Sequence, residues 1–312
     1  MQVRSLPAGV ALSLLAAVPA VGLPGSAAGD RFVTLTRSSS WTLERSVPIA
    51  FPAHHPQGLV KIGERLFFSS VEVTTPPRRG AGTEGFDRDT GRGVGHLFEA
   101  RMDGSLVADV VLGEGAIYHP GGLDFDGRDI WVPVAEYRPN SRSIVYRVDA
   151  TTRKAVEMFR FPDHLGGVVI DTEDRSLHAV SWGSRWFYRL ALDPSGRPIN
   201  ADAPPPSLRV ANRSHYVDYQ DCKYVGQHRM LCSGIADVVR GGGERPLPLG
   251  GIDLIDLTTG APLHQLPVGL RTPAGNSLTR NPSFFEAIDG GGLRAYVLPD
   301  DDQATLYVYR IE

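Results

Sequence analysis

The feature that most constrains this chain is a motif that recurs along its length. The clearest copy is the segment 118–127, Tyr-His-Pro-Gly-Gly-Leu-Asp-Phe-Asp-Gly, whose histidine is His119. Four more segments fall into the same frame, and they start at His55, His164, His215 and Asn281. An apolar run, a turn rich in Gly and Asp, and a second apolar run follow these starts. Such a repeat indicates an array of similar structural units that pack against one another.

Each repeat is predicted to form four β-strands. In the second copy we expect the strands at residues 122–125, 129–135, 143–148 and 155–161. The apolar residues alternate or form short runs, which is typical of strands, and Asp, Gly and Thr gather at the reversals. Because no stretch has a helical period of useful length, a fold that alternates strands with helices is disfavoured.

The last repeat lacks its fourth strand. Strands are expected at 284–288, 293–298 and 305–311, and then the chain stops. Residues 41–51 alternate as a strand that belongs to no repeat, so this strand can complete the last unit and leave no unpaired edge. The prediction is an all-β, five-bladed β-propeller closed by an N-terminal strand that completes the C-terminal blade. A β-sandwich is the alternative, but it would not explain why the two ends complement each other.

The first 28 residues have the features of a secretory signal. A basic start at Arg4 precedes an apolar run at 10–21, and small residues at 26–28 suggest cleavage after Ala28. The apolar run is too short for a stable membrane span. We therefore expect an exported protein with a single propeller domain at residues 41–312.

The two cysteines are expected to form a disulfide. Cys222 and Cys232 flank a turn at residues 225–227, and a hairpin there would place them opposite each other. Export to an oxidising compartment favours the bond. Two buried thiols in the same hairpin are the alternative that the sequence leaves open.

The charge balance excludes some classes of partner. The chain has 32 Lys and Arg against 35 Asp and Glu, which gives a formal net charge of −3. A balance so close to zero argues against nucleic acid and against an anionic membrane surface. We expect a small-molecule ligand, no membrane insertion and a monomer.

The propeller topology predicts a polar site at one end of the central channel. The innermost strand of each blade would start at the repeated histidine, and the second strand would return to the same end. Glu72 and Glu136 follow their histidines at the same distance, so they should reach that end too. The residues expected at this mouth or just below it are His55, His119, His164, His215, Asn281, Glu72, Glu136, Trp182, Asp300, Asp218 and Asp221.

This concentration of imidazole and carboxylate groups suggests a divalent metal, Ca²⁺ or Zn²⁺. The metal ligands would be His55, His119, His164 and His215. Glu72, Glu136 and Asp218 would be catalytic, and Trp182, Asn281 and Asp300 would bind substrate. Without a metal, the two glutamates would act as an acid–base pair.

The alternative is a purely structural role, in which the repeated histidines only fix the entry of the chain into each blade by hydrogen-bonding to the backbone. Five further histidines fall outside the repeat frame and are interpreted as surface or packing residues: His54, His96, His178, His228 and His264.

The motifs resemble those of a family of secreted bacterial propeller proteins, a domain of unknown function. The resemblance rests on His-Pro-Gln-Gly-Leu at 55–59 and on the segment 119–127, and it covers the whole chain after the signal. More remotely, the chain is similar to calcium-dependent lactonases and gluconolactonase-like hydrolases, whose channel ligands are carboxylates and Asn. That similarity implies such roles for Glu72, Glu136, Asp218 and Asn281. The histidine-rich rim departs from the pattern.

The chain is also remotely similar to plant-type glutaminyl cyclases, which are five-bladed. Segments 55–59 and 219–226 match related strand starts, while that family's Asn-Glu-Leu-Glu is absent here. A shared fold does not imply a shared function. We therefore predict a metal-assisted hydrolase of a small ester, lactone or phosphoester. A non-enzymatic binding or scaffold protein and a glutaminyl cyclase-like acyl-transfer enzyme are the alternatives.

Overall fold

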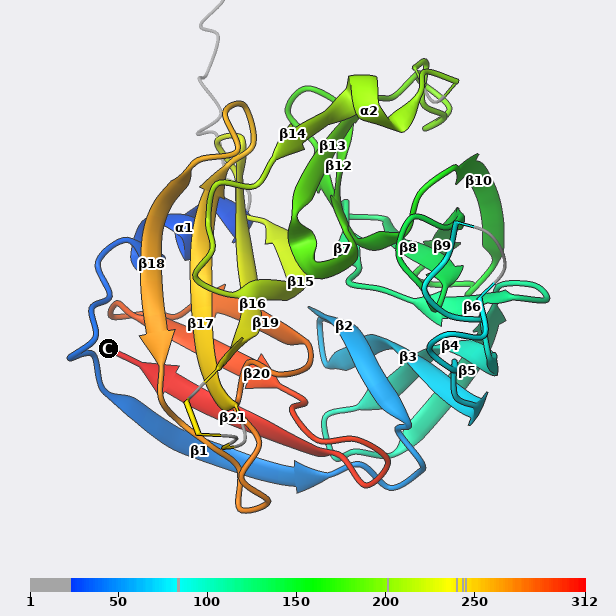
Figure 1. The fold of residues 1–312 in the computed structure, drawn as a ribbon. Helices are drawn as coiled ribbons and strands as arrows, with labels where there is room; N and C mark the ends of the chain where they lie inside the picture. Colours follow the sequence, from blue (N-terminus) through cyan, green and yellow to red (C-terminus); the bar gives the residue numbers. More distant parts are fainter. Residues whose placement is uncertain (1–23, 83–84, 201, 240, 243, 245) are drawn as a thin grey trace, which may run out of the picture.

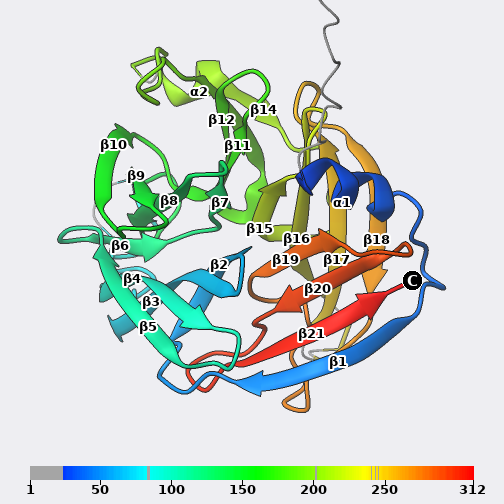
Figure 2. The ribbon, with the colours of Figure 1, turned by 180° about the vertical axis from the view of Figure 1, so that it is seen from behind.

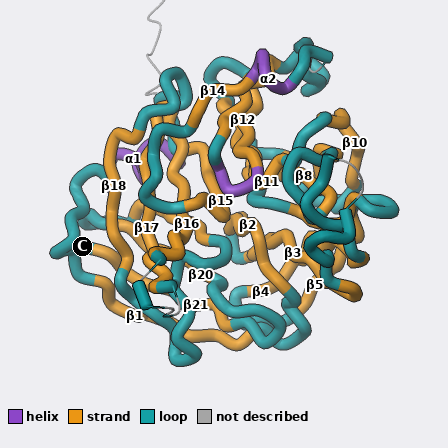
Figure 3. The backbone as a smooth tube through the Cα atoms, viewed as in Figure 1, coloured by secondary structure: helices purple, strands orange, loops and turns teal. Residues whose placement is uncertain are grey.

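The chain forms five antiparallel sheets arranged in a ring, as Figure 1 shows. The computed structural model describes residues 24–82, 85–200, 202–239, 241–242, 244 and 246–312. Within these residues helix is confined to α1 (Pro24–Phe32), α2 (Pro205–Leu208) and the single turn η1 (Trp182–Ser184), drawn purple in Figure 3. The predicted five-bladed β-propeller is confirmed.

The sheets are numbered here as blades I to V in chain order, and the strands of each are given from the inside of the ring outward. Blade I has β2 (His55–Ile62), β3 (Arg65–Thr75), β4 (Arg92–Arg101) and β5 (Leu106–Leu112), and blade II has β6 (Ile117–Pro120) with β7 (Asp124–Phe125), then β8 (Asp129–Glu136), β9 (Ser143–Asp149) and β10 (Ala155–Phe161). Blade III has β11 (Leu165–Asp171), β12 (Ser176–Ser181), β13 (Trp186–Ala191) and β14 (Arg209–Ala211), and blade IV has β15 (Asp218–Tyr224), β16 (Arg229–Val238), β17 (Leu247–Asp256) and β18 (Pro262–Val268). Blade V has β19 (Ser283–Ala287), β20 (Leu293–Val297), β21 (Thr305–Ile311) and β1 (Trp41–Pro48).

The N-terminal strand closes the ring. β1 is antiparallel to β21, with Trp41 opposite Ile311 and Pro48 opposite Thr305, and Figure 2 shows the two strands along the outer edge. The backbones of Ser40 and Glu312 exchange hydrogen bonds of 2.7 and 3.1 Å. The predicted completion of the last blade by the N-terminal strand is therefore confirmed.

The hydrophobic core lies in the seams between the blades. Each of five clusters of buried apolar side chains joins two neighbouring blades. Successive side chains of a strand point to opposite faces, so one strand supplies two seams. On β3, Phe67 packs against blade II and Phe68 packs against blade V. A ring of blades needs this two-sided apolar pattern, because each blade is covered on both faces.

Side-chain bridges and close backbone contacts join the inner strands in the middle of the channel. Asp221, fully buried, accepts from the amide of Leu59 at 2.9 Å and pairs with Lys223. Lys223 also donates to the carbonyl of Leu123 at 2.6 Å. The backbones at Gly58 and Leu123 also come close together, and only a glycine fits there, since a Cβ on Gly58 would lie 2.5 Å from the amide nitrogen of Leu123. Asp221 thus links blades I and IV.

Helix α1 packs beneath the seam between blades IV and V. Ala28, Phe32 and Leu35 are buried in the cluster that these two blades share. The predicted signal peptide, residues 1–28, overlaps the start of this helix, and its residues 1–23 lie outside the described residues. Cleavage after Ala28 would cut the helix between two buried apolar side chains, and this boundary stays a prediction.

The disulfide is formed. Cys222 and Cys232 are directly opposite each other on β15 and β16, with their Cα atoms 4.0 Å apart. The predicted disulfide is therefore confirmed, and the hairpin brings the two cysteines opposite each other as expected. A disulfide is typical of proteins in oxidising compartments.

One long connection differs from its expected position. The insertion at residues 194–214 directly precedes His215 in the sequence, which favours a place at the end of the channel where the repeated histidines lie. Most of it joins β13 to β14, so it lies at the other end, where Arg147 donates to the carbonyl of Ser195. The reason is that β14 is only three residues long and starts at Arg209, so most of the insertion precedes the outer strand.

Candidate functional site

The inner strands begin on one face of the ring, which we call the histidine face. Three long connections start and end on this face: those that follow β3, β16 and β18. His55 starts β2, His119 lies in β6, and His164 immediately precedes β11. The structure thus places these three predicted site residues around the opening of the channel. We call this opening, with its three histidines, the channel mouth.

His55 forms a dyad with Asp301. Nδ1 of His55 lies 2.7 Å from Oδ1 of Asp301, and about a third of each side chain is exposed. An ionised carboxylate only accepts hydrogen bonds, so Nδ1 carries the hydrogen and a neutral His55 keeps a lone pair on Nε2. This leaves a base that solvent can reach.

Asp301 is held in its charged form. Its second oxygen binds Arg280 at 2.7 Å, and Nδ2 of Asn281 donates to Oδ1 at 2.9 Å. Burial acts to raise the pKa of Asp301, but the bonds and charges of His55, Asn281 and Arg280 outweigh it and lower this pKa to about 2. The carboxylate is therefore ionised at neutral pH and can stabilise a protonated His55.

His119 and His164 are neutral at physiological pH. Burial lowers the pKa of His164 to about 4, and its Nδ1 donates to the carbonyl of Glu136 at 2.9 Å. Burial also lowers the pKa of His119 well below its ordinary value of 6.5, and His164 and His55 add to the effect. Nδ1 of His119 is buried and has no hydrogen-bond partner. The mouth therefore holds two desolvated imidazoles, and that of His119 has a ring nitrogen with no partner in the protein.

Aromatic rings explain this desolvation. Tyr137 stacks on His119 with the ring centroids 4.1 Å apart, and Trp182 meets His164 edge to face at 4.7 Å. Arg88, from the connection at residues 76–91, lies over Trp182 at 5.3 Å. Trp182 therefore forms part of the wall of the mouth, which is compatible with the predicted contact with substrate.

Glu136 is fully enclosed by its own ion pairs. Arg138 binds one carboxylate oxygen and Arg142 binds the other, each at 2.6 Å. The carboxylate is buried, so its charge is neutralised by the two guanidinium groups. The predicted acid–base role of Glu136 would require one of these arginines to leave.

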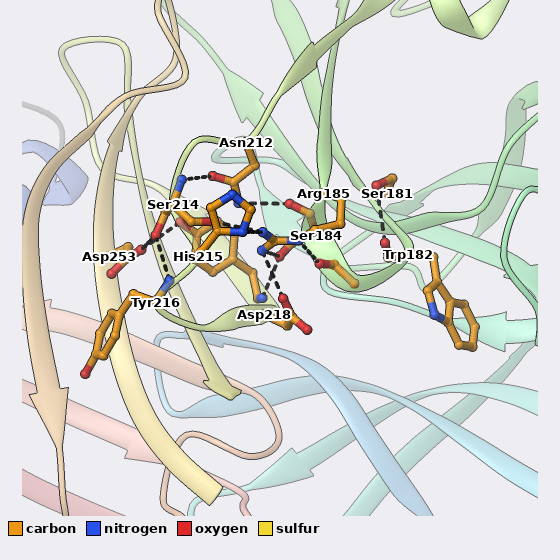
Figure 4. A network of polar contacts seen from close by, with 12 residues as sticks. Ser181, Trp182, Ser184, Arg185, Asn212, Ser214, His215, Tyr216, Asp218 and Asp253 are labelled. Atoms are coloured by element: carbon orange, nitrogen blue, oxygen red, sulfur yellow. Dashed lines mark hydrogen bonds and ion pairs between the residues drawn. The ribbon is translucent and has the colours of Figure 1, made fainter. Parts of the chain in front are cut away.

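His215 and Asp218 lie together on blade IV, and Figure 4 shows what joins them. Arg185 contacts Nδ1 of His215 and Oδ1 of Asp218, both at 2.9 Å, while Trp182 points away from this network. Burial raises the pKa of Asp218, and the charge of Arg185 opposes the shift. A guanidinium beside His215 makes that ring a poor neighbour for a cation.

Asn281 and Asp300 differ in how completely they are bonded. Asp300 accepts from Thr272 at 3.2 Å and from Asn276 at 2.8 Å. Asn281 is fully buried, and its Oδ1 has no partner even though its Nδ2 is bonded. Of these two predicted substrate-binding residues, Asn281 is the one with a buried acceptor that has no partner in the protein, and such an atom can accept from a ligand or water.

Candidate metal-ligand groups are present, but at places other than the predicted four histidines. In the described part of the chain, two groups have ligand atoms within 4.8 Å of one another: His54 with Glu72 and His96, and Asp171 with Asp174 and His228. Glu72 is the predicted site residue that joins one of them. His54, His96 and His228 are instead residues that the sequence analysis assigned to the surface or to packing.

Several site residues were not found from the sequence. Asp301 follows the predicted Asp300 in an acidic run, and only the loop conformation decides which of them meets His55. Arg138 and Arg142 stand two and six positions after Glu136, and this proximity of opposite charges was a signal that a sequence can provide. Tyr137 and Arg185 carry no such signal.

The chain belongs to a family of unknown function, DUF6454, whose model matches residues 13–311. The match agrees with the predicted family of propellers with no assigned function. A comparison with curated proteins finds no match.

Solved structures with a similar fold have very different names. A luciferin-regenerating enzyme is 12% identical, with a TM-score of 0.47 and 88% of this chain and 95% of that chain covered. The tail fiber of Staphylococcus aureus phage P68 is 10% identical, with a TM-score of 0.50 and 90% and 55% covered. A 6-phosphogluconolactonase-like protein of Bacteroides fragilis is 12% identical, with a TM-score of 0.38 and 81% and 86% covered. At such identities the likeness concerns the fold alone.

None of the helices in the described residues has the length and apolar character that a membrane crossing requires.

Proposed function

We propose that this chain is an exported hydrolase that cleaves a small ester or lactone at the channel mouth. The observation that carries the proposal is the dyad of His55 and Asp301, an accessible imidazole oriented by an ionised carboxylate. This pairing is the arrangement that general-base catalysis needs, because the carboxylate fixes the ring and stabilises the imidazolium.

In the proposed reaction, Nε2 of His55 takes a proton from a water molecule while the water oxygen attacks the substrate carbonyl carbon. The carbonyl–alkoxy bond then breaks, and the imidazolium returns the proton to the departing alkoxide. Asp301 keeps its charge throughout and only holds Nδ1–H. General-base catalysis of this kind contributes about 10²–10⁴-fold in rate.

His119, His164 and Asn281 support substrate binding in this proposal. The two neutral imidazoles and the free Oδ1 of Asn281 offer polar contacts in a site from which water is partly excluded. Trp182 covers the apolar part of the substrate. Because Glu136 is bound by two arginines, the proposal assigns it a structural role and moves the catalytic base to His55.

The test is hydrolysis by the purified exported protein, measured on short-chain esters, aliphatic lactones, phosphomonoesters and a peptide with N-terminal Gln. We expect turnover of an ester or lactone, with a loss of about 10²-fold or more in His55→Gln and in Asp301→Asn. His228→Gln, at the other end of the channel, is the matched control and should keep the wild-type rate. Equal rates in all three variants would contradict the dyad.

A second outcome separates the main alternatives. If the wild-type protein hydrolyses nothing but a lactone or ester binds, and His55→Gln weakens that binding, the channel mouth belongs to a non-enzymatic binding protein. Cyclisation of the Gln peptide would instead support the acyl-transfer alternative.

A further inference from the structure

A second cluster of histidine and carboxylate groups lies beside the channel mouth, where the seam between blades V and I reaches the histidine face. It consists of His54, Glu72 on β3, and His96 on β4. The nearest pair is Nε2 of His96 and Oε2 of Glu72, 3.8 Å apart. This separation is too long for a hydrogen bond but suits two atoms that bind one ion, since Zn–N and Zn–O bonds are about 2 Å long.

The bonding of His96 shows which of its nitrogens is available. Nδ1 lies 3.0 and 3.1 Å from the two carboxylate oxygens of Asp109 on β5, so this nitrogen carries the hydrogen. Nε2 then keeps its lone pair, and it is buried without a partner in a side chain that is only 9% exposed. Buried polar atoms are nearly always bonded, so an Nε2 that faces Glu72 and has no partner in the protein is a candidate ligand for a cation.

His54 is held in position by its backbone and by its ring. Its φ of 53° is in the left-handed region, which is uncommon for residues other than glycine. The ring stacks on His96 with the centroids 5.2 Å apart, and His96 stacks in turn on Phe98 at 4.9 Å. The two imidazoles are therefore fixed before any ion arrives, which lowers the ordering cost of binding.

We propose that His54, Glu72 and His96 bind one divalent transition metal of the zinc class, with Asp109 as the residue that orients His96. Two imidazoles and one carboxylate are a ligand set that zinc uses with a fourth position open to water. A carboxylate on the far nitrogen of a metal-binding histidine is the usual support for such a ligand. Ca²⁺ fits less well, because it prefers six or more oxygen ligands.

The site would also steady the catalytic dyad, and this part of the inference rests on the proposed function. His54 immediately precedes His55, and the amide of Asp302 donates to the carbonyl of His54. Ala53 in turn donates to the carbonyl of Asp302 at 2.8 Å. A metal bound to His54 would therefore fix the two hydrogen-bonded backbone segments that carry His55 and Asp301.

The other group with suitable spacing is already satisfied by the protein itself. Asp171 bonds to Nδ1 of His228 at 2.6 Å, while Asp174 accepts from Ser176 and pairs with Arg189. Neither carboxylate faces an unpartnered buried nitrogen. This group therefore serves as the control for the proposed site.

The experiment is metal titration of the full exported protein after chelator treatment, without a histidine tag. Zn²⁺ binding is followed by calorimetry, and Co²⁺ binding is followed by the visible absorption of a tetrahedral Co²⁺ site. We expect one ion per chain, a loss of at least about 100-fold in affinity in His54→Ala and Glu72→Gln, and about 10–100-fold in Asp109→Asn. Asp174→Asn should bind like the wild type.

His54 and Glu72 are partly exposed, so these variants should fold, and circular dichroism checks this. Failure of the wild type to bind one ion, or unchanged affinity in both His54→Ala and Glu72→Gln, would overturn the metal site. The readout is separate from turnover: if the metal binds as expected and His55→Gln hydrolyses normally, the proposed dyad fails while the metal site stands.

Discussion

Blades I and II place a histidine and a glutamate at matching positions on the histidine face, yet the two pairs have opposite surroundings. In blade I, His55 and Glu72 are partly exposed, and they point to different neighbours, Asp301 and His96. In blade II, His119 is buried without a partner for Nδ1, and Glu136 is enclosed by two arginines. One pair is partly accessible to solvent, whereas the other is buried.

This comparison shows that the repeat fixes where the backbone lies, whereas the neighbouring loops determine which groups surround each side chain. Arg138 and Arg142 belong to the short connection after β8, and they neutralise Glu136. The longer connection after β3 leaves the carboxylate of Glu72 beside His96 instead. Equivalent positions in a propeller can therefore acquire different surroundings while the strands of the blades keep the same pattern.

The largest effect that tests this comparison is on stability. Glu136→Gln leaves the largely buried guanidinium of Arg138 without its carboxylate, whereas Arg142 is 68% exposed and can turn to solvent, so we expect a loss of about 3 kcal/mol in the free energy of unfolding. Glu72→Gln in metal-free protein should change it by less than about 0.5 kcal/mol, because that side chain is 42% exposed. Urea unfolding of both variants gives the measurement. Similar losses in the two would show that the copies are equivalent after all.

The next effect is the dependence of stability on pH. His119 and His164 have pKa values lowered mainly by burial, His164 to about 4, whereas in the unfolded chain both return to about 6.5. The unfolded state then binds more protons, so the free energy of unfolding falls as the pH drops below 6.5. Between pH 7 and pH 5 we expect a loss on the order of 1–2 kcal/mol per histidine.

The variant that tests this assignment is His119→Gln, which should weaken the pH dependence. Tyr137→Phe keeps both imidazoles and is the matched control, so its slope should equal that of the wild type. Asp301 does not interfere in this range, because its pKa is lowered to about 2 and its contribution is lost only below about 3.8. A slope that survives His119→Gln unchanged would contradict the desolvation of that ring.

The smallest effect on stability is expected from a substitution that places an arginine beside Glu72 of blade I, as Arg138 lies beside Glu136 in blade II. Thr74 stands two positions after Glu72, as Arg138 does after Glu136, and it is exposed. Thr74→Arg should add a surface ion pair worth about 0.2–1 kcal/mol and should weaken Zn²⁺ binding by competing for Glu72. Thr74→Gln controls for side-chain size. If Thr74→Arg binds zinc as tightly as Thr74→Gln does, the carboxylate of Glu72 is not a ligand.

The fold was predictable because its signals are local and repeated. The five strand patterns, the missing last strand and the hairpin of Cys222 and Cys232 each follow from periodicity and turn residues. The mouth was predictable in part, because the repeat frame placed His55, His119 and His164 on one face. The partners were not, since Asp301 and His54 reach their positions through loop backbone, including a left-handed residue, that no periodicity describes.

The pairing of β1 with β21 makes the propeller sensitive to its own completeness. During synthesis β1 emerges first and β21 last, so this sheet contact spans nearly the whole chain and cannot form early. A product that ends before β21 would leave both the unpaired β1 and the outer edge of β20 exposed. Unpaired strand edges can pair with other chains, so the loss of this one sheet contact would expose the protein to aggregation.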